Sequence, residues 1–232
     1  MPRGSTSHRP PEPEQSQVQS QALDPELVKL RRKQIVEAAI KLFADQGYYK
    51  TTVQDVARKA KISTGLIYHY ARTKEDILLL SLLSVLESYK QELPPAIAQS
   101  KHPLERLFNG LAAYCRVIDA SKQATVLAYR STKSLPKHQR ELVMQSEIET
   151  NAMIEACLSD CVKAGLFREV DLGLTAYHFV NYAHAWALKY WRLRNLTTHE
   201  AYIREGFEFF VHALATPKGW RMYQRIREQL VP

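Results

Sequence analysis

Apolar residues recur at helical spacing along most of the chain. From Asp24-Pro25 onward, the first run places five of them on one face at a period of 3.6, namely Ile35, Ala38, Ala39, Leu42 and Phe43. Gly47 is suited to end this helix in the left-handed conformation. Alternating runs with hairpin turns are not visible in the sequence, and neither is an internal repeat. The pattern predicts an all-α fold.

Three further helix starts follow within a short stretch. Thr52 can cap the amide of Asp55 while the carboxylate of Asp55 reaches back, which begins a short helix. Ser63 can cap a second short helix that runs to about residue 70. Thr73 and Asp76 repeat the reciprocal cap at the head of a longer, leucine-rich helix.

Past Pro94-Pro95 the periodicity stays helical and predicts helices at roughly 103–120, 123–132, 137–164, 171–194 and 199–214. Breaks are expected at Ser134-Leu135-Pro136, Gly165, Asn195 to Thr198 and Pro217. Residues 218–232 mix basic and aromatic side chains, which favours an amphipathic helix folded back on the body over a solvated basic tail. Residues 1–24 are rich in Pro, Ser, Gln and Glu, and this composition predicts a disordered tail.

The composition is that of an ordinary soluble globular protein, with 45% hydrophobic and 24% charged residues. The longest apolar run, Ile77 to Leu86, is too short to cross a bilayer, and no charged-then-apolar leader stands at the N-terminus. We therefore expect a cytoplasmic protein with no membrane partner. Three cysteines argue against a disulfide framework.

The net charge of +8 is concentrated toward the N-terminus. Residues 26–76 hold eleven Lys or Arg against six Asp or Glu, a net of +5, whereas the much longer stretch 77–232 reaches only +4. Concentrated positive charge suggests a polyanion partner such as nucleic acid, whose counterions are released when its phosphates are contacted. A lysine-rich solvated face is the alternative interpretation.

A short helix, a three-residue turn and a second short helix have the geometry of a helix-turn-helix, whose second helix enters the major groove of DNA. At the level of residues, the segment GYYKTTVQDVARKAKISTGLIYHYARTKEDIL resembles the N-terminal domain of the TetR/AcrR family of transcriptional repressors. The matching features are Gly47, the Thr51-Thr52 pair, Asp55-Val56-Ala57, Ala60, Ser63, Gly65, Tyr68, Tyr70, Lys74-Glu75 and Leu78. Two positions depart from the pattern: Lys61 stands where the family usually has glycine, and Tyr70 where it usually has phenylalanine.

The resemblance is specific over about residues 30–80. It implies a three-helix DNA-binding domain with the helix-turn-helix at 25–73, followed by a helical-bundle domain for ligand binding and dimerisation at 74–232. The implied function is that of a ligand-responsive transcriptional regulator and not an enzyme. It would be a repressor that binds a palindromic operator of double-stranded DNA as a dimer, and that a small hydrophobic or acyl-CoA-like effector releases. No cofactor is implied.

By the same resemblance, six residues would serve DNA binding: Thr52, Thr64, Gly65, Tyr68, His69 and Lys74. Three of them, at 64, 65 and 69, would lie near the groove. The other three would contact phosphates, two of these at helix starts, where an anion is favoured. Simpler roles stay open: a solvated histidine at 69, a core tyrosine at 68, a cap alone at 52 and a solvated lysine at 74. Two roles are equally compatible with Lys50, Arg58 and Lys59: supplementary phosphate contacts, or plain surface charge.

The resemblance also implies a homodimer through the helices at about 171–194 and 199–214, and an effector pocket among the middle helices. The pocket candidates are Tyr114, Arg116, Tyr129, Arg130, His178, Asn181, Tyr182 and Trp186. Arg116 and Arg130 suit a carboxylate or a CoA phosphate, with a surface salt bridge as the alternative for each. An aromatic stripe at helical spacing can also be ordinary core.

Other classes of function are less well supported. Cys157 and Cys161 lie four residues apart, with His178 and His184 on the next helix. Zinc sites usually place cysteines on a tight knuckle, so buried cysteines at a helix contact are favoured. Nucleophile, Walker and dinucleotide fingerprints are not found in the sequence, nor are the Glu-x-x-His pairs of helical-bundle enzymes. A non-specific architectural DNA-binding protein is the stronger rival, and it would need basic charge spread along the chain.

Overall fold

A computed structural model describes residues 25–230 and confirms the all-α fold. The predicted disordered tail at 1–24 lies outside the described residues. The helices are α1 (Pro25–Gln46), α2 (Val53–Ala60), α3 (Thr64–Tyr68), α4 (Lys74–Ile97), α5 (Pro103–Ala120), α6 (Lys122–Ser131), α7 (Lys137–Lys163), α8 (Leu172–Leu188), α9 (Tyr190–Leu193), α10 (His199–Leu214) and α11 (Pro217–Ile226). Two short 3₁₀ turns, η2 (Thr132–Ser134) and η3 (Arg227–Gln229), complete the described elements.

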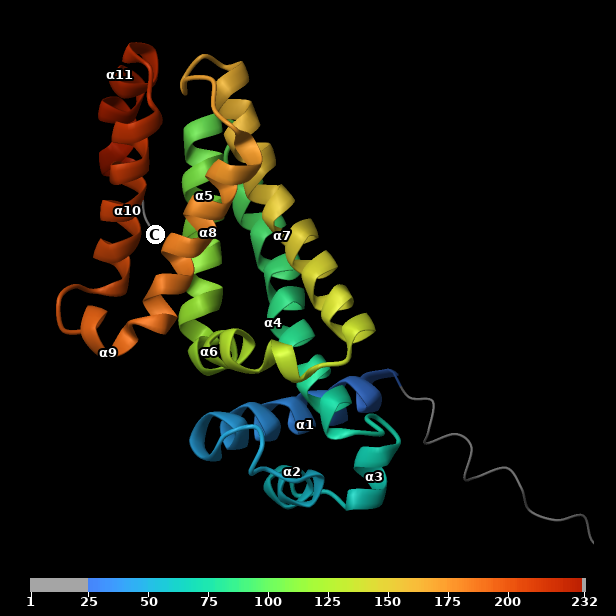
Figure 1. Cartoon of the computed structure of the whole chain (residues 1–232). Helices are drawn as coiled ribbons and strands as arrows, with labels where there is room; N and C mark the ends of the chain where they lie inside the picture. Colours follow the sequence, from blue (N-terminus) through green and yellow to red (C-terminus); the bar gives the residue numbers. More distant parts are fainter. Residues whose placement is uncertain (1–24, 231–232) are drawn as a thin grey trace, which may run out of the picture.

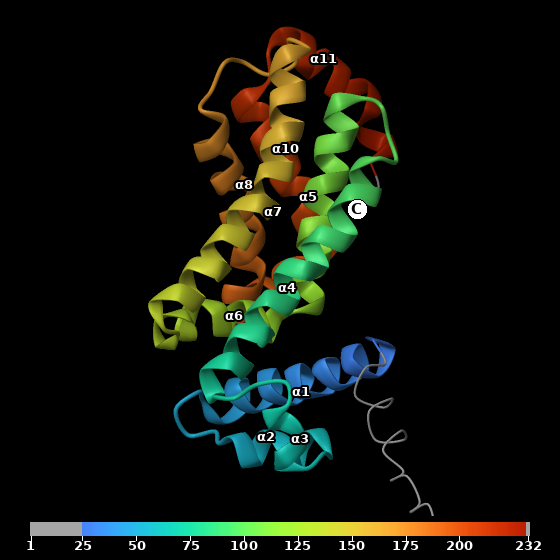
Figure 2. The same cartoon turned by 90° about the vertical axis from the view of Figure 1, so that its right-hand side faces the viewer.

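The helices form two lobes that α4 joins. Figure 1 shows α1, α2 and α3 gathered at one end, with α4 rising from them into a bundle with α5, α7 and α8. The short helix α6 lies across the base of this bundle next to α1, and α10 and α11 run along its side (Figures 1 and 2). A small N-terminal lobe therefore sits under a larger helical body, and α6 lies at the joint between them.

All three predicted N-caps form in the N-terminal lobe. Thr52 Oγ1 accepts the N–H of Asp55 at 3.1 Å, and the Asp55 carboxylate accepts the N–H of Thr52 at 3.0 Å. Thr73 and Asp76 form the same reciprocal pair at the start of α4. Ser63 Oγ accepts an amide hydrogen at the start of α3. Each side chain satisfies an amide that the helix leaves unpaired, which contributes about 1 kcal/mol per cap.

Two residues beside the helix-turn-helix adopt left-handed backbone. Gly47 ends α1 at φ +88°, as predicted. Lys61 ends α2 at φ +57° and ψ +43°, and no other non-glycine residue in 25–230 has a positive φ. A residue with a Cβ is disfavoured in this conformation by about 1–2 kcal/mol. This cost is a physical reason for the glycine that the TetR/AcrR family, which the sequence resembles, usually has here.

An aromatic clasp joins α8 to α10. The rings of Tyr182 and Tyr202 stack with centroids 4.4 Å apart, and each hydroxyl donates to the other residue's backbone carbonyl at 2.6 Å. Gly206 makes room for it, because a Cβ at this position would lie 2.2 Å from the Tyr182 ring. The stacked pair of Phe179 and Phe210, with centroids 3.9 Å apart, extends the contact.

The C-terminal segment is the amphipathic helix that its sequence favoured. Tyr223 and Ile226 on α11 are buried against the body, and Leu230 after it is buried as well. Gly219 lies so close to the chain after α7 that a Cβ would meet the Leu166 carbonyl oxygen at 1.9 Å. Across residues 25–230, no helix combines the length and apolar character needed to span a bilayer.

One predicted boundary needs correction. The segment 171–194 is not one helix, since it breaks at Lys189 (φ −117°, ψ +20°) into α8 and α9. The break lets the Tyr190 ring pack edge-on against Trp186 at 5.8 Å while the Lys122 ammonium covers it. Pro94 and Pro95 lie in the last turn of α4, which continues to Ile97, and the carbonyls that they leave unpaired there can face water.

Candidate DNA interface and buried polar core

Helix α3 has one anchored face and one open face. Ile67 is fully buried and fixes the helix against the N-terminal lobe. On the outer side, a Cβ added at Gly65 would meet nothing nearer than the Ser63 hydroxyl at 4.0 Å. Tyr68 is 48% exposed and His69 is exposed. The sequence alternative of a core tyrosine at 68 is therefore at odds with the structure, in which residues 64, 65, 68 and 69 lie together on or beside α3.

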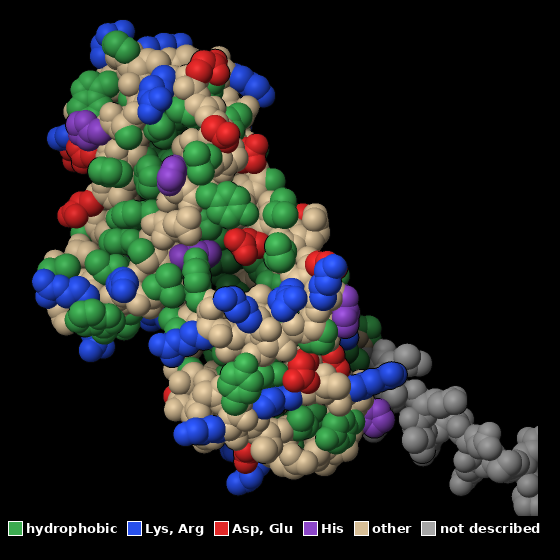
Figure 3. Space-filling view, viewed as in Figure 1, with side chains coloured by type: hydrophobic (Ala, Val, Ile, Leu, Met, Phe, Trp, Pro, Cys, Tyr) green, Lys and Arg blue, Asp and Glu red, His purple; other side chains and the backbone are tan. Residues whose placement is uncertain are grey.

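Cationic side chains surround this open face. Exposed lysines and an arginine flank α2 and α3 at Lys50, Lys59, Lys61 and Arg72. The Arg58 guanidinium is engaged within the protein, since it donates to the Asp55 carboxylate at 2.7 Å. Figure 3 shows Lys and Arg side chains spread over the N-terminal lobe and the adjoining base of the body. The surface around α3 is thus suited to a polyanion.

The side chains of Thr52 and Lys74 are engaged within the protein. Thr52 Oγ1 donates to the Asp55 carboxylate at 2.7 Å while it accepts the Asp55 N–H. The Lys74 ammonium donates to the backbone carbonyls of Tyr48, Tyr49 and Thr51 at 3.1–3.3 Å, and it lies 4.5 Å from the centre of the Tyr48 ring. Lys74 is thus not the solvated lysine considered from the sequence, because its ammonium holds the loop between α1 and α2.

Two polar contacts cross the joint between the lobes. The Tyr49 hydroxyl, from the loop after α1, lies 3.0 Å from the Ser134 hydroxyl in η2. Gln139, at the start of α7, donates from Nε2 to the Asp76 carboxylate at 2.7 Å. The Asp76 carboxylate also accepts the N–H of Thr73 in the capping box of α4, so the body contacts a side chain that helps to start the helix joining the two lobes.

A chain of polar side chains passes through the body from α6 to α7. The Tyr129 hydroxyl lies 2.9 Å from His184 Nδ1, and the Tyr114 hydroxyl lies 3.5 Å from His184 Nε2. Tyr114 in turn donates to Asn151 Oδ1 at 3.4 Å. The ring of Tyr89 stacks on that of Tyr114 with centroids 4.1 Å apart. We call these five residues, from five helices, the polar core.

Two polar atoms of the polar core lack a hydrogen-bond partner in residues 25–230. The hydroxyl of Tyr89 and the Nδ2 of Asn151 are buried, and within the described residues neither finds a partner in hydrogen-bonding geometry. An unpaired buried polar group destabilises a fold by about 1–3 kcal/mol. Each such group therefore needs a physical explanation, of which a binding role is one.

Burial keeps the polar core uncharged. It lowers the pKa of His184 to about 4, so the imidazole is neutral at physiological pH. It also raises the pKa of Tyr89, Tyr114 and Tyr129, and that of the nearby Glu147 carboxyl. Lys and Arg are absent from the buried side chains of residues 25–230.

The structure corrects the predicted effector set. Tyr114 and Trp186 are buried, and Tyr182 is partly buried in the clasp with Tyr202. Arg116, Arg130, His178 and Asn181 are exposed, because the helical phase turns them outward. The Trp186 indole N–H is also taken, since it donates to the Asp119 carboxylate at 2.7 Å. The eight residues therefore do not line one cavity.

Tyr89, Asn151 and His184 were missed as effector candidates, although a sequence signal exists for the first two. Tyr89 continues the buried stripe of Leu78, Leu82, Leu86 and Leu93 along α4. Asn151 lies in the buried stripe of α7, beside Thr150 and one turn before Ile154. A polar residue in an otherwise apolar stripe is worth singling out, because it needs partners inside the protein.

The cysteines are placed as ordinary core. Cys157 and Cys161 are 2% and 0% exposed, and burial raises the pKa of their thiols to about 11 and about 12. His184 is held by tyrosines and His178 is exposed. Across residues 25–230, no group of three or more His, Cys, Asp or Glu side chains converges as a metal site would require.

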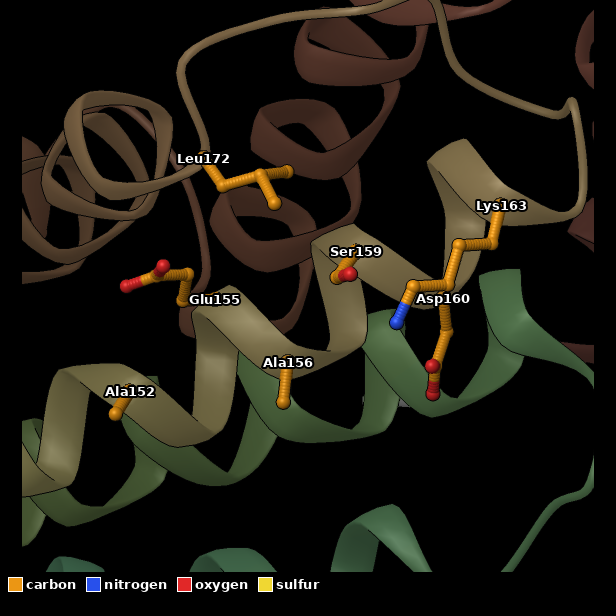
Figure 4. A pocket seen from close by; sticks show the side chains of 7 residues that line it. All are labelled: Ala152, Glu155, Ala156, Ser159, Asp160, Lys163 and Leu172. Carbon is orange, nitrogen blue, oxygen red and sulfur yellow. The ribbon is translucent and has the colours of Figure 1, made fainter.

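A hollow of about 350 Å³ lies on the outer surface of the body (Figure 4). Ala152, Ala156 and Ser159 on α7 form its floor, and Leu172 at the start of α8 stands at one side. A second hollow of about 260 Å³ lies between α1 and α2. Neither is lined by any predicted effector residue or by the polar core.

Large apolar side chains are exposed on α8 and α10. On α8, Leu174 and Tyr177 are 59% and 41% exposed and share a face with His178 and Asn181. On α10, Phe209 is 68% exposed. This apolar face, Leu174, Tyr177 and Phe209, is available for a partner surface.

Two family models match separate parts of the chain. The family model described as "Bacterial regulatory proteins, tetR family" matches residues 35–80, and that described as "Tetracyclin repressor-like, C-terminal domain" matches residues 100–188. The HTH-type transcriptional regulator HbdR of Aromatoleum sp. (strain CIB) is 49% identical over 202 residues, which cover 87% of this chain and 88% of that protein.

Solved structures with the same fold span both lobes. The TetR family transcriptional regulator PfmR from Thermus thermophilus superposes with a TM-score of 0.68 at 26% identity, over 77% of this chain and 97% of that one. The regulator AibR, solved in complex with isovaleryl coenzyme A and operator DNA, superposes with a TM-score of 0.59 at 20% identity, over 68% of this chain and 85% of that one.

Proposed function

The chain belongs to the TetR family of bacterial regulatory proteins, and from this premise we propose that it is a ligand-responsive transcriptional repressor. It binds a palindromic operator in the cytoplasm as a homodimer, and a small hydrophobic or acyl-CoA-like effector in the body releases it. The DNA-binding unit is residues 25–73, and residues 74–232 bind the effector and the second subunit.

The observation that carries the DNA-binding part is the open face of α3. A helix of five residues reaches few bases, so it needs its outer side chains free and its inner face fixed. Thr64, Gly65 and His69 are assigned to the groove, and Tyr68 to a phosphate. In residues 25–230, the side chains of Tyr68 and His69 make no hydrogen bond or ion pair that would have to break first.

Thr52 and Lys74 serve DNA binding through the backbone at their helix starts. Their side chains are used in the cap and in the loop, but the first amides of α2 and α4 point outward from the helix ends, where an anion is favoured. The Lys74 ammonium then acts by holding the loop between α1 and α2 in place for the phosphate.

The apolar face of α8 and α10 is assigned to the second subunit. One five-residue reading helix gives little specificity, and a dimer places two of them about 34–36 Å apart, on successive major grooves. Burial of Leu174, Tyr177 and Phe209 in an isologous contact would remove the largest exposed apolar side chains of the two helices from water.

The polar core is assigned to the effector. It lies in the body, as an effector site should. Its member Tyr129 is on α6, and α6 leads directly into η2. Because Ser134 of η2 contacts Tyr49 in the N-terminal lobe, the polar core is connected to the joint. AibR, which shares the fold, was solved with an acyl-CoA, and this supports an acyl compound as the effector class. An effector acts only through its different affinity for the DNA-binding and released states.

Selection of DNA from a random pool tests this proposal. The protein should enrich an inverted repeat, and fluorescence anisotropy should show that Tyr68→Ala weakens binding to all duplexes while Thr64→Ala changes which bases are preferred. Leu142→Ala, at an exposed leucine on α7, is the matched control and should bind as the wild type does. Equal binding of unrelated duplexes, with no repeat enriched, would instead identify an architectural DNA-binding protein.

A further inference from the structure

Two polar contacts hold the N-terminal lobe to the body, and we call them the joint contacts. One joins the hydroxyls of Tyr49 and Ser134, which lie 3.0 Å apart. In the other, Gln139 Nε2 donates to the Asp76 carboxylate at 2.7 Å. Both body residues belong to the stretch 134–139, which runs from η2 into α7 and lies at the base of the body, directly above the N-terminal lobe (Figure 1). One short stretch of the body therefore bonds to two separate segments of the lobe.

Tyr49 reaches the joint from a loop that is itself held in place. Its side chain is 82% exposed, and within residues 25–230 its hydroxyl has no other hydrogen bond. The Lys74 ammonium binds the backbone carbonyl of Tyr49 at 3.3 Å. The Tyr48 ring packs edge-on against the Tyr49 ring, with centroids 5.3 Å apart. The exposed ring is thereby kept in position to meet Ser134.

Asp76 connects the second contact to the segment that follows α3. Its Oδ2 accepts the N–H groups of Arg72 and Thr73 at 2.9 and 3.0 Å, and its Oδ1 accepts from Gln139. Arg72 is the fourth residue after Tyr68, where α3 ends. Two consecutive hydrogen bonds thus lead from the start of α7 to the backbone behind the reading helix.

The Gln139 side chain is fixed in direction but gains little stability. It is 7% exposed, and among the described residues its Oε1 has no hydrogen-bond partner. The amide cannot turn over, because its carbonyl would then oppose the Asp76 carboxylate. A hydrogen bond to a charged group is stabilising, whereas the buried unpaired acceptor costs a comparable amount. The main effect of Gln139 is therefore to orient the two lobes.

Bonds at two points oppose a rotation that one bond would permit. The lobes are joined by α4, and α6 packs on α1 beside it. Apolar packing has no preferred direction, whereas hydrogen bonds weaken steeply when their angles change. Tyr49 lies in the loop before α2 and Asp76 in the first turn of α4, so a turn of the lobe about α4 would distort at least one joint contact.

An inverted repeat requires a defined angle between the two reading helices. One base pair more between the half-sites moves one of them by about 3.4 Å along the duplex and turns it by about 35° around the axis. Shared equally between two subunits, the turn is about 17° for each α3. A dimer whose lobes turn freely accepts this change, and a dimer whose lobes are held does not.

We propose that Gln139 and Tyr49 are positioning residues, which set the half-site spacing that the dimer accepts by holding the lobes through the joint contacts. The inference rests on the proposed function, since it requires a dimer on an inverted repeat. It adds that selectivity for spacing is determined at the joint, by side chains that read no base.

Operators with altered spacing test the proposal on the full-length protein. The half-sites that the wild type selects are kept, and one or two base pairs are added or removed between them. The wild type should prefer its own spacing over a change of one base pair by at least about 100-fold, because a contact worth about 10-fold or more is distorted in each subunit. Gln139→Met, which keeps the size of the side chain, should lower this preference at least about 10-fold, and Tyr49→Phe about 3- to 10-fold.

Gln145→Met is the matched control. Gln145 lies on the same helix, but its amide donates to Glu149 at 3.2 Å on the surface of the body, so the spacing preference should equal that of the wild type. Gln139→Met removes a hydrogen bond together with an unpaired acceptor, and it should melt close to the wild-type temperature. If it unfolds instead, the exposed Tyr49→Phe decides. A wild-type preference retained by Tyr49→Phe and by a folded Gln139→Met, or affinity lost equally at every spacing, would overturn the inference.

Spin labels measure the freedom of the lobes without DNA. Lys59→Cys on α2 and Leu142→Cys on α7 place one label in each lobe, and the native cysteines are at most 2% exposed. In protein diluted with unlabelled chains, the label-to-label distances should spread more widely in Gln139→Met and Tyr49→Phe than in the wild type. Equal widths would overturn the inference. Failure to enrich any inverted repeat would instead overturn the proposed function, so the two failures are distinguished.

Discussion

Replacement of Lys61 by glycine should stabilise the protein. Lys61 is held at φ +57° at the end of α2, where a residue with a Cβ is disfavoured by about 1–2 kcal/mol. Glycine removes that cost but gives the unfolded chain more freedom, which offsets roughly 0.5–1 kcal/mol. The net gain is about 0.5–1 kcal/mol, or a rise in melting temperature of about 1–4 °C for a chain of this size.

Lys61→Ala is the matched control, since it removes the same charge but keeps the Cβ. Thermal unfolding of the three proteins, at one protein concentration because a dimer's stability depends on it, should place only the glycine variant above the wild type. Both variants should bind operator more weakly, with the salt slope reduced by about 1 if the ammonium contacts a phosphate. A glycine variant no more stable than the alanine variant would refute the argument from backbone strain.

Three further predictions follow from the body. Gly206→Ala should lower the free energy of unfolding by about 1–3 kcal/mol, because the new Cβ would displace the Tyr182 ring, whereas Gly173→Ala, which meets only ordinary contacts, should not; urea unfolding measures both. Since the pKa of His184 falls from 6.5 to about 4 on folding, the unfolded chain takes up the proton first and stability is lost as pH falls from about 6.5 to 4. Between pH 7.5 and 5 a His184→Gln variant should lose about 2 kcal/mol less than the wild type, and equal losses would contradict the shift. Phe209→Glu should convert the dimer to a monomer in light scattering with unchanged circular dichroism, while Leu142→Glu should remain a dimer.

Local chemistry explains which elements could be predicted from the sequence. The caps of Thr52, Ser63 and Thr73 depend on residues three apart, and all three form. The departure at Lys61 could be noticed from the sequence, but its left-handed backbone is seen only in the structure. The break at Lys189 was not predicted, and one contact of the Tyr190 ring beyond it comes from Lys122, which is far away in sequence.

The proposed effector site was the least predictable part. Arg116 lies two residues after the buried Tyr114, and that step of about 200° around α5 turns it to solvent. His178 and Asn181 lie opposite the buried side of α8, which carries Phe179, Ala183 and Trp186. The polar core brings together five helices, and no spacing along one helix can reveal which polar residues of the others it will meet.

The central claim is that α3 lies in the major groove while a second subunit fixes where its counterpart binds. A His69→Cys variant carrying an iron chelate tests it directly, since the three native cysteines are at most 2% exposed and their thiols should not label. Cleavage of bound operator should form two clusters, symmetric about the dyad and about 34–36 Å apart along the helix axis. A single cluster, or cleavage no different from that of the same chelate at a Leu142→Cys variant, would contradict the account.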